Sequence, residues 1–242
     1  MKGLTPEQKA QYERDGYTIL KSVFSKAECE EFVEHMMALH SGEKTLEGFA
    51  PREPDDWGRT NNQHWYDPKA LALLIDSRLR QPLEDCFEDD VEGIQTMYFY
   101  KGSEGRRHQD QCPLPGCMSA WLPLVDVNEA NGTIYIQPGS HKGQLVTYWE
   151  TLDENGKMDY EYRHAKTERI FEDNNRPEIS IIANQGDAVL FHGGLIHRGG
   201  PIKQRGALRH VMANHYIPYR FKDWPHTTWP RTSFDGKQRY TD

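Results

Sequence analysis

The sequence lacks the features that would place the protein in a membrane or mark it for export. Within its 242 residues, no apolar run approaches the ~18 residues that a membrane-spanning helix needs. The N-terminal stretch MKGLTPEQKAQYERDG has no apolar core of the kind found in signal peptides. We therefore expect a soluble, cytoplasmic protein with no membrane partner.

Positive charge is also in short supply. The chain has 29 Lys and Arg against 37 Asp and Glu, which gives a net charge of -8 and a pI of about 5.8. Proteins that bind nucleic acids in general usually present a basic face. We therefore expect a small-molecule substrate and no nucleic-acid partner, although GRRH (105–108) indicates a local basic pocket.

Cysteine is scarce and scattered. Without an export signal, Cys29, Cys86, Cys112 and Cys117 do not predict a disulfide framework. The spacing of Cys112 and Cys117 is also found in zinc sites, but these need a second pair of ligands and none is evident. Two reduced thiols beside a proline-rich loop are the favoured interpretation.

Residues 1–92 have a mostly helical pattern. Helices are predicted from Thr5 and from Ser25, because each begins a capping box with a residue three positions later, Gln8 and Glu28 respectively. A short strand is expected between them at 17–24, and a loop over 43–66. Residues 67–87 predict a further helical segment that is interrupted at Pro82.

Residues 93–218 consist of short β-rich runs divided by turn residues, a texture typical of a sandwich, jelly roll or barrel. We therefore predict a mainly β fold with flanking helices (α+β), in one domain over 1–242. The tail, 219–242, is polar and aromatic without a clear period, and either covers the barrel or lies loose. The predicted strands are IQTMYFYKG, MSAWLPLVDV, TIYIQPGS, PEISIIA, GDAVLFHGG and LRHVMANHYIP.

His108 and Asp110, in EGRRHQDQC, are the first candidate metal ligands. In an extended backbone, residues i and i+2 leave on the same face, so an imidazole and a carboxylate can reach one ion. A third ligand can come from GDAVLFHGGLIHRGGP, which holds His192 and His197. Two histidines and one carboxylate are the ligand set of non-haem Fe(II) oxygenases.

Arg209 is the candidate anion-binding residue. On an extended strand Arg209, Val211, Ala213 and His215 would share one face. A guanidinium pointing into a barrel needs an anion, and its planar fork suits a carboxylate. The alternative is that Arg209 pairs with an internal acid or lies outside.

Several segments, taken in order, resemble the phytanoyl-CoA dioxygenase family of Fe(II)- and 2-oxoglutarate-dependent oxygenases, whose core is a double-stranded β-helix (jelly roll, cupin-like). The resemblance runs from about Leu4 to Tyr216, and the combination is far more specific than any one segment. The segments that carry it are LTPEQKAQYERDGYTILKSVFSKAECEEF, HQDQ, SAWLPLVDVNEANGTIYIQPGSHKG, GDAVLFHGGLIHRGGP and RHVMANHY.

The resemblance implies roles for the candidate residues. His108, Asp110 and His197 would bind Fe(II), with His197 preferred to His192 because the family ligand precedes a small-residue turn and a proline. Arg209 would bind the distal carboxylate of 2-oxoglutarate, the cosubstrate that is used together with O2. A carboxylate ligand also implies hydroxylation, because halogenating relatives lose it.

Further cosubstrate contacts follow from the same resemblance. Trp121 occupies the position of a family tryptophan that lies against 2-oxoglutarate, and Met97 a position that lines that pocket. Where the family often has a hydroxyl residue, this chain has Gly199. The missing hydrogen bond is expected from Thr133 or Tyr98.

Two groups of residues are candidate substrate contacts. Arg106 and Arg107 precede His108 and are expected near the pocket mouth, and a polar cluster on the 43–66 loop is expected to fold over it. Both groups favour a small polar or anionic substrate, and we expect a free molecule and not a coenzyme A thioester. The alternative is that these residues simply lie on the surface. The polar cluster consists of Asn61, Asn62, Gln63 and His64.

Two rival functions remain open at this point. A cupin-type metal-binding protein or cosubstrate-independent enzyme also uses histidine and carboxylate ligands, but has no need of Arg209. A non-catalytic relative would bind iron or 2-oxoglutarate as a sensor.

Overall fold

The computed structural model describes residues 2–51, 58–102, 104–204 and 206–241. Residues 52–57 of the predicted loop, and Asp242 of the tail, lie outside the described residues. No helix in the described part is long and apolar enough to span a membrane.

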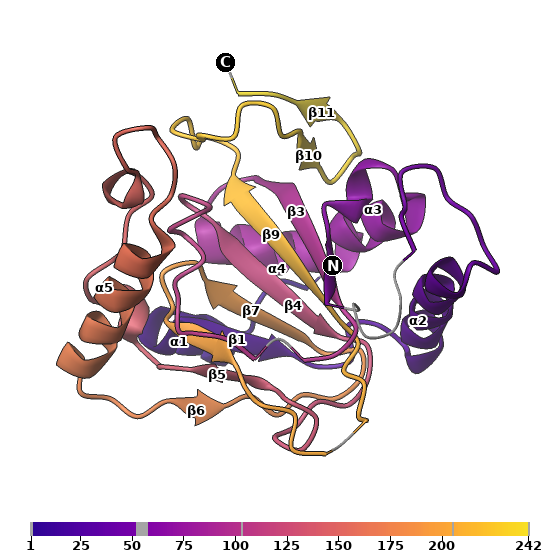
Figure 1. Ribbon diagram of the computed structural model, residues 1–242, viewed down its shortest axis with the longest axis horizontal. Coiled ribbons are helices and arrows are strands. Elements are labelled where there is room, and N and C mark those ends of the chain that lie inside the picture. Colours follow the sequence, from indigo (N-terminus) through magenta and orange to yellow (C-terminus); the bar gives the residue numbers. More distant parts are fainter. Residues whose placement is uncertain (1, 52–57, 103, 205, 242) are drawn as a thin grey trace.

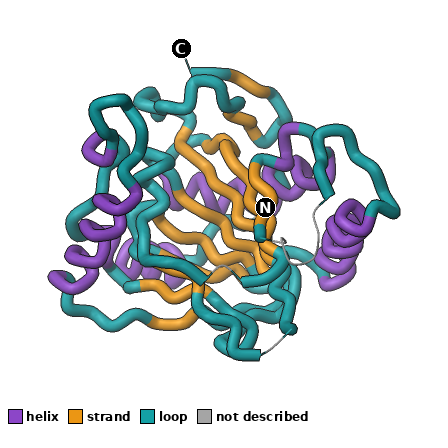
Figure 2. Tube along the Cα trace, viewed as in Figure 1, coloured by secondary structure: helices purple, strands orange, loops and turns teal. Residues whose placement is uncertain are grey.

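Two antiparallel sheets form the centre of the molecule (Figure 1). The major sheet has the strand order β1-β7-β4-β9-β3-β10-β11, with β2 pairing with β3, and the minor sheet has the order β6-β5-β8. Figure 2 shows the strands gathered in the middle, with helices at the two sides and behind them. The strands are β1 (Tyr17–Leu20), β2 (Arg59–Asn61), β3 (Val91–Phe99), β4 (Met118–Pro123), β5 (Ile134–Ile136), β6 (Ile179–Ser180), β7 (Ala188–His192), β8 (His197–Gly199), β9 (Val211–Pro218), β10 (Arg231–Ser233) and β11 (Gln238–Arg239).

Five α-helices surround the sheets, with α1 and α4 behind the major sheet in Figure 1 and α5 at one side. The first two helices begin at the predicted capping boxes, at Thr5 and Ser25. Each ends at a glycine with positive φ, Gly16 or Gly42, a conformation that glycine adopts without strain. The helices are α1 (Pro6–Asp15), α2 (Lys26–Ser41), α3 (Pro68–Leu74), α4 (Ser77–Phe87) and α5 (Tyr160–Asp173).

The predicted interruption at Pro82 is wrong. The break falls earlier, where α3 ends at Leu74 and Asp76 caps α4 by accepting a hydrogen bond from the Arg78 amide. Pro82 lies buried inside α4. Burial of the apolar ring offsets part of the cost of the one backbone hydrogen bond that proline cannot donate.

The alternation along β3 separates two cores. Tyr98 packs on the outer face of the major sheet among the N-terminal helices, with residues such as Met36 and Leu79. Met97 and Phe99 point the other way, into the apolar cluster between the two sheets. This arrangement of two facing antiparallel sheets confirms the predicted mainly β fold with a jelly-roll core.

The tail covers one edge of the sheet and does not lie loose. Its strand β10 pairs with β3, and Trp224 is buried in a small apolar cluster with Ile94 and Ile217. The buried Arg231 donates to Glu92 on β3 at 2.7 Å. The tail therefore extends the major sheet beyond the predicted barrel.

Candidate metal centre and active-site cavity

The chain segment that carries His108 joins the minor sheet through its backbone. The amide of His108 donates to the carbonyl of His197 at 2.9 Å, and the amide of His197 donates back to the carbonyl of His108 at 3.0 Å. This antiparallel bridge places the two imidazole rings 4.3 Å apart between their centroids. Residues 89 positions apart in the sequence therefore become immediate neighbours.

The side chains of His108, Asp110 and His197 converge on one point. Each offers one ligand atom, and these atoms lie within 4.8 Å of one another. The Nε2 atoms of His108 and His197 each lie 3.6 Å from Oδ1 of Asp110. Two imidazole nitrogens and one carboxylate oxygen on one side of a point form the facial arrangement that suits Fe(II) and leaves other positions open.

The backbone orients both imidazole rings for this role. Nδ1 of His108 lies 3.0 Å from the carbonyl of Arg106, and Nδ1 of His197 lies 3.0 Å from the carbonyl of Leu195. A carbonyl only accepts, so each Nδ1 carries the proton and each Nε2 presents its lone pair. Burial, with a smaller effect of the neighbouring His197, lowers the pKa of His108 to about 3, so this ring is neutral at pH 7.

Asp110 is held by two donors on its other oxygen. The Ser119 hydroxyl donates to Oδ2 at 2.9 Å, and Nε2 of His215 lies 3.3 Å from the same atom. Burial alone would raise the pKa of Asp110, but the neighbouring His197 and the hydrogen bond from His215 outweigh it and hold this pKa well below its ordinary value. The carboxylate is therefore ionised, with Oδ1 turned toward the two imidazoles.

His192 does not belong to this cluster. Its Nδ1 accepts a hydrogen bond from the Gly194 amide at 2.9 Å, and its ring packs near Tyr12 and His141. Of the two histidines in GDAVLFHGGLIHRGGP, the structure brings His197 to His108 and Asp110. Cys112 and Cys117 are free thiols buried in separate apolar clusters.

A cavity of about 820 Å³ opens over the three convergent side chains. One wall is the inner face of the major sheet, including Gln95, Met97, Trp121 and His215. The opposite side is formed by α5 and the segment before it, and the tail adds His226 and Trp229. The cavity is deep enough to hold a cosubstrate and a substrate side by side, as judged from the usual size of ligand pockets.

Arg209 lies beside this cavity. It is fully buried just before β9, and its guanidinium carbon lies 5.6 Å from the ring centre of Trp121. Burial lowers the pKa of Arg209 to about 10, which still leaves it charged at pH 7. The predicted strand residue Arg209 in fact precedes β9, which begins at Val211.

Two predicted cosubstrate contacts are not brought to the cavity. Tyr98 points to the opposite face of β3, where its hydroxyl lies 2.7 Å from Nδ1 of His210. Thr133 is fully buried, and its hydroxyl donates to the carbonyl of Ile181. Neither side chain lines the cavity, and the hydrogen bond of either to the cosubstrate stays a prediction.

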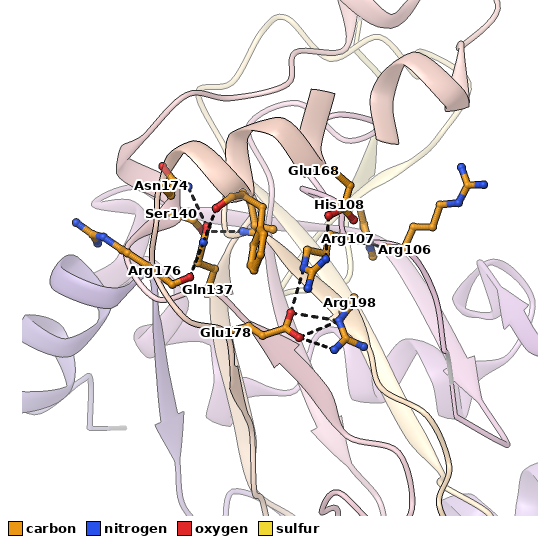
Figure 3. A network of polar contacts seen from close by, with 12 residues as sticks. Arg106, Arg107, His108, Gln137, Ser140, Glu168, Asn174, Arg176, Glu178 and Arg198 are labelled. Atoms are coloured by element: carbon orange, nitrogen blue, oxygen red, sulfur yellow. Dashed lines mark hydrogen bonds and ion pairs between the residues drawn. The ribbon is translucent and has the colours of Figure 1, made fainter. Parts of the chain in front are cut away.

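The two arginines before His108 separate. Arg106 lines the cavity and forms an exposed ion pair with Glu161 at 2.9 Å. Arg107 turns away and forms ion pairs with Glu168 on α5 and with Glu178 (Figure 3). Arg107 does not line the cavity, because the acidic residues of α5 and of the segment after it bind it elsewhere, and its contact with substrate stays a prediction.

The polar cluster predicted to fold over the mouth is also placed elsewhere. His64 is buried beneath β3, with Nδ1 3.1 Å from the Thr96 hydroxyl. Asn61 pairs with Met97 at the end of β2, and Asn62 turns the chain with positive φ. None of the three lines the cavity, whereas Gly58 and Arg59 from the same segment do.

Sequence reasoning missed three residues at this site. Ser119 and His215 fix Asp110, and Arg163 of α5 lines the cavity. For His215 a signal existed, because it shares a strand face with Ala213 and Met97 pairs with Ala213 across the sheet. Ser119 and Arg163 depend on strand register and on a helix that had not been predicted.

Two facing antiparallel sheets that hold a two-histidine, one-carboxylate cluster are typical of Fe(II)- and 2-oxoglutarate-dependent oxygenases. Within this class, the family model described as phytanoyl-CoA dioxygenase (PhyH) matches residues 12–211. The chain belongs to this family.

Similar proteins support the family and the fold. Phytanoyl-CoA dioxygenase 1 of Oryza sativa subsp. japonica is 30% identical over 148 residues, which cover 56% of this chain and 48% of the rice protein. The non-heme alpha ketoglutarate dependent carbocyclase SnoK from nogalamycin biosynthesis has a TM-score of 0.67 at 16% identity, covering 89% of this chain and 84% of its own. HygX from Streptomyces hygroscopicus, with nickel and 2-oxoglutarate bound, has a TM-score of 0.62 at 20% identity, covering 92% and 90%.

Proposed function

We propose that this protein is an Fe(II)- and 2-oxoglutarate-dependent dioxygenase that hydroxylates a small polar or anionic molecule and releases succinate and CO2. The observation that carries the proposal is the convergence of two Nε2 lone pairs and one Asp110 oxygen on the floor of a cavity. The N-terminal helices and the tail pack on the same β core, so we also propose that residues 1–242 act as one domain.

The residues present fit the proposed iron. His108 and His197 are fixed as Nε2 ligands by their backbone carbonyl partners, and Asp110 supplies a carboxylate oxygen. Bound Fe(II), with 2-oxoglutarate and O2, would supply the oxidising chemistry. The chain itself holds the ligands, orients the two organic molecules and excludes water.

Arg209 is the proposed partner of the distal carboxylate of 2-oxoglutarate. Its guanidinium is buried and charged, and it lies against Trp121, which lines the cavity together with Met97. A carboxylate placed there would receive charge-assisted hydrogen bonds in a poorly solvated setting, where such bonds are strong. A cupin-type protein that uses no cosubstrate has no need of an arginine at this place.

The Asp110→Ala variant tests the proposed reaction. We expect it to abolish 2-oxoglutarate-dependent oxygen consumption, because the ion loses its only carboxylate ligand among the three convergent side chains. Oxygen uptake and succinate formation are measured together, with and without Fe(II).

The exposed Asp223 provides a matched control, and Asp223→Ala should keep the wild-type rate. Undiminished turnover in Asp110→Ala would remove Asp110 from the ligand set. Binding of iron and 2-oxoglutarate by the wild type, without succinate release for any substrate in a broad screen, would favour the sensor interpretation over the enzyme.

A further inference from the structure

Arg163 is a buried arginine on the wall of the active-site cavity. It lies on the inner face of α5 with Thr167 and Ile170, at positions i, i+4 and i+7. Only 8% of the residue is exposed, and it lines the same cavity as His108 and His197. Figure 1 shows α5 standing at the side of the two sheets.

Acidic residues of α5 and of the segment after it are paired with other arginines. Glu161 pairs with Arg106, and Glu168 pairs with Arg107. Glu178 pairs with Arg107 and Arg198 (Figure 3).

Arg163 itself has no such partner in the part of the chain that the structure describes. Its guanidinium forms no ion pair with any described carboxylate, and its buried Nε finds no hydrogen-bond acceptor there. A buried N–H group without an acceptor is costly, because it has given up its hydrogen bond to water without replacing it. An acceptor from outside the chain would remove this cost.

The location of Arg163 relates it to the reacting centre. Arg163 lines the same cavity as His108 and Asp110, two of the three proposed iron ligands. Arg209 lies just before β9 and beside Trp121, so the two buried arginines belong to different parts of the fold.

We propose that Arg163 binds the carboxylate of the primary substrate. This inference rests on the proposed function, because it takes the molecule bound in the cavity to be the substrate of the oxygenase. One guanidinium matches the single charge of a carboxylate better than the double charge of a phosphate, and Glu104, which also lines the cavity, adds negative charge.

The other residues that line the cavity indicate which kind of substrate body would fit beside Arg163. Apolar and aromatic side chains line the cavity around Arg163, among them Leu152, Met158, Tyr148 and Trp229. A small monocarboxylic acid with an apolar or aromatic body fits this composition. The carboxylate would bind Arg163, and the carbon chain would extend along the apolar wall toward His108 and His197.

Matched acids and amides test the proposal on the full chain as purified, with saturating 2-oxoglutarate and no added iron. The probes are 3-phenylpropionate against 3-phenylpropionamide and hexanoate against hexanamide, followed by thermal unfolding at increasing probe concentration. We expect each acid to raise the melting temperature at concentrations where its amide does not. Arg163→Gln should weaken binding of the acids about tenfold or more, the usual effect of losing a charged hydrogen-bond partner.

Two further variants control this measurement. Arg163→Lys keeps the charge and should retain part of the preference for acids. Arg169→Gln, an equivalent change on the exposed face of the same helix, should leave binding unchanged, because Arg169 is 84% exposed. If Arg163→Gln fails to fold, Arg163→Lys carries the comparison through its weaker but intact preference for acids over amides.

Four results would overturn the proposal. The amides could bind as well as the acids, or the acids could bind to Arg163→Gln as well as to the wild type. No probe acid could bind at all, or inorganic phosphate or sulfate could bind more tightly than the acids in a way that depends on Arg163. Loss of 2-oxoglutarate binding in Arg163→Gln, with probe binding intact, would likewise reassign Arg163 to the cosubstrate. This measurement needs neither added iron nor turnover. A negative result would therefore count against the proposed role of Arg163 and not against the proposed oxygenase reaction.

Discussion

The two carboxylate oxygens of Asp110 have different contacts. Its Oδ1 faces the two imidazoles, and its Oδ2 accepts hydrogen bonds from Ser119 and from His215. The orientation of the carboxylate is therefore fixed before any ion binds. Partners that fix a ligand in this way commonly change metal affinity when they are removed.

The Ser119→Ala variant tests this division. Oδ2 would lose its shorter hydrogen bond, and the carboxylate would be free to rotate, so we expect Fe(II) to bind about 10–100-fold more weakly. Anaerobic competition against a chelator measures the affinity.

Ser180→Ala is the matched control, because Ser180 bonds to Glu129 on the surface of β6, away from the cavity. Equal affinities for wild type and Ser119→Ala would show that His215 alone positions the carboxylate.

At the residue scale, sequence reasoning succeeded where local geometry decides. The i and i+2 spacing of His108 and Asp110 placed both on one side of the chain, and the structure brings His197 to them. It did not anticipate the ion pairs of Arg107, because a charged side chain is attracted to nearby opposite charges. The acids that attract it, Glu168 and Glu178, belong to segments far along the sequence.

At the element scale, α5 is the part of the fold that the sequence pattern did not predict. Its buried face consists of Arg163, Thr167 and Ile170, so two of its three inward residues are polar. An apolar stripe, the main signal for an amphipathic helix, is therefore absent. The helix is held instead by its Asp159 cap and by ion pairs with residues outside it.

Glu178 is central to those ion pairs. It joins Arg107, which also binds Glu168 on α5, to Arg198 on β8. We expect Glu178→Gln to lower the free energy of unfolding by about 1–3 kcal/mol, since two partly buried arginines lose a charged acceptor. Amide hydrogen exchange over residues 160–173 should become faster, while the outer helices keep their protection.

The surface pair of Glu129 and Lys203 supplies the control. Glu129→Gln removes an exposed ion pair of the kind that contributes little to stability, and should change neither unfolding nor exchange. Unchanged exchange over α5 in Glu178→Gln would mean that the helix is held by its apolar contacts alone.

At the scale of the whole molecule, the sequence predicted the fold class and not its extensions. Short β runs after Gly93 indicated the two-sheet core, because alternation and turn residues are local signals. The pairing of β10 with β3, and the burial of Trp224 under the tail, depend on contacts with strands far back in the chain. A polar, aromatic tail without a period carries no local sign of them.

Buried neutral histidines make the stability of the whole molecule depend on pH. Burial lowers the pKa of His64 and of His210 to about 4. Between the ordinary histidine pKa of ~6.5 and pH 4, the unfolded chain takes up protons that the folded protein refuses. The free energy of unfolding should therefore decrease as pH falls through this range, by up to about 1.4 kcal/mol per pH unit for each such histidine.

Denaturant unfolding at pH values from 7 to 4.5 measures this slope. His64→Phe removes one of these histidines. The free energy of unfolding of this variant should therefore depend less steeply on pH, by the effect of about one proton taken up on unfolding. A flat profile for the wild type would show that these histidines take up protons in the folded state.

The central claim is that His108, Asp110 and His197 form an iron site that takes 2-oxoglutarate beside it. Anaerobic titration with Fe(II) and 2-oxoglutarate tests it most directly, because a chelated pair gives a weak visible charge-transfer band that neither component gives alone. We predict that the band appears in the wild type only when both are present, and that it is lost in Asp110→Ala. A well-folded wild-type protein that shows no band with both components would contradict the account.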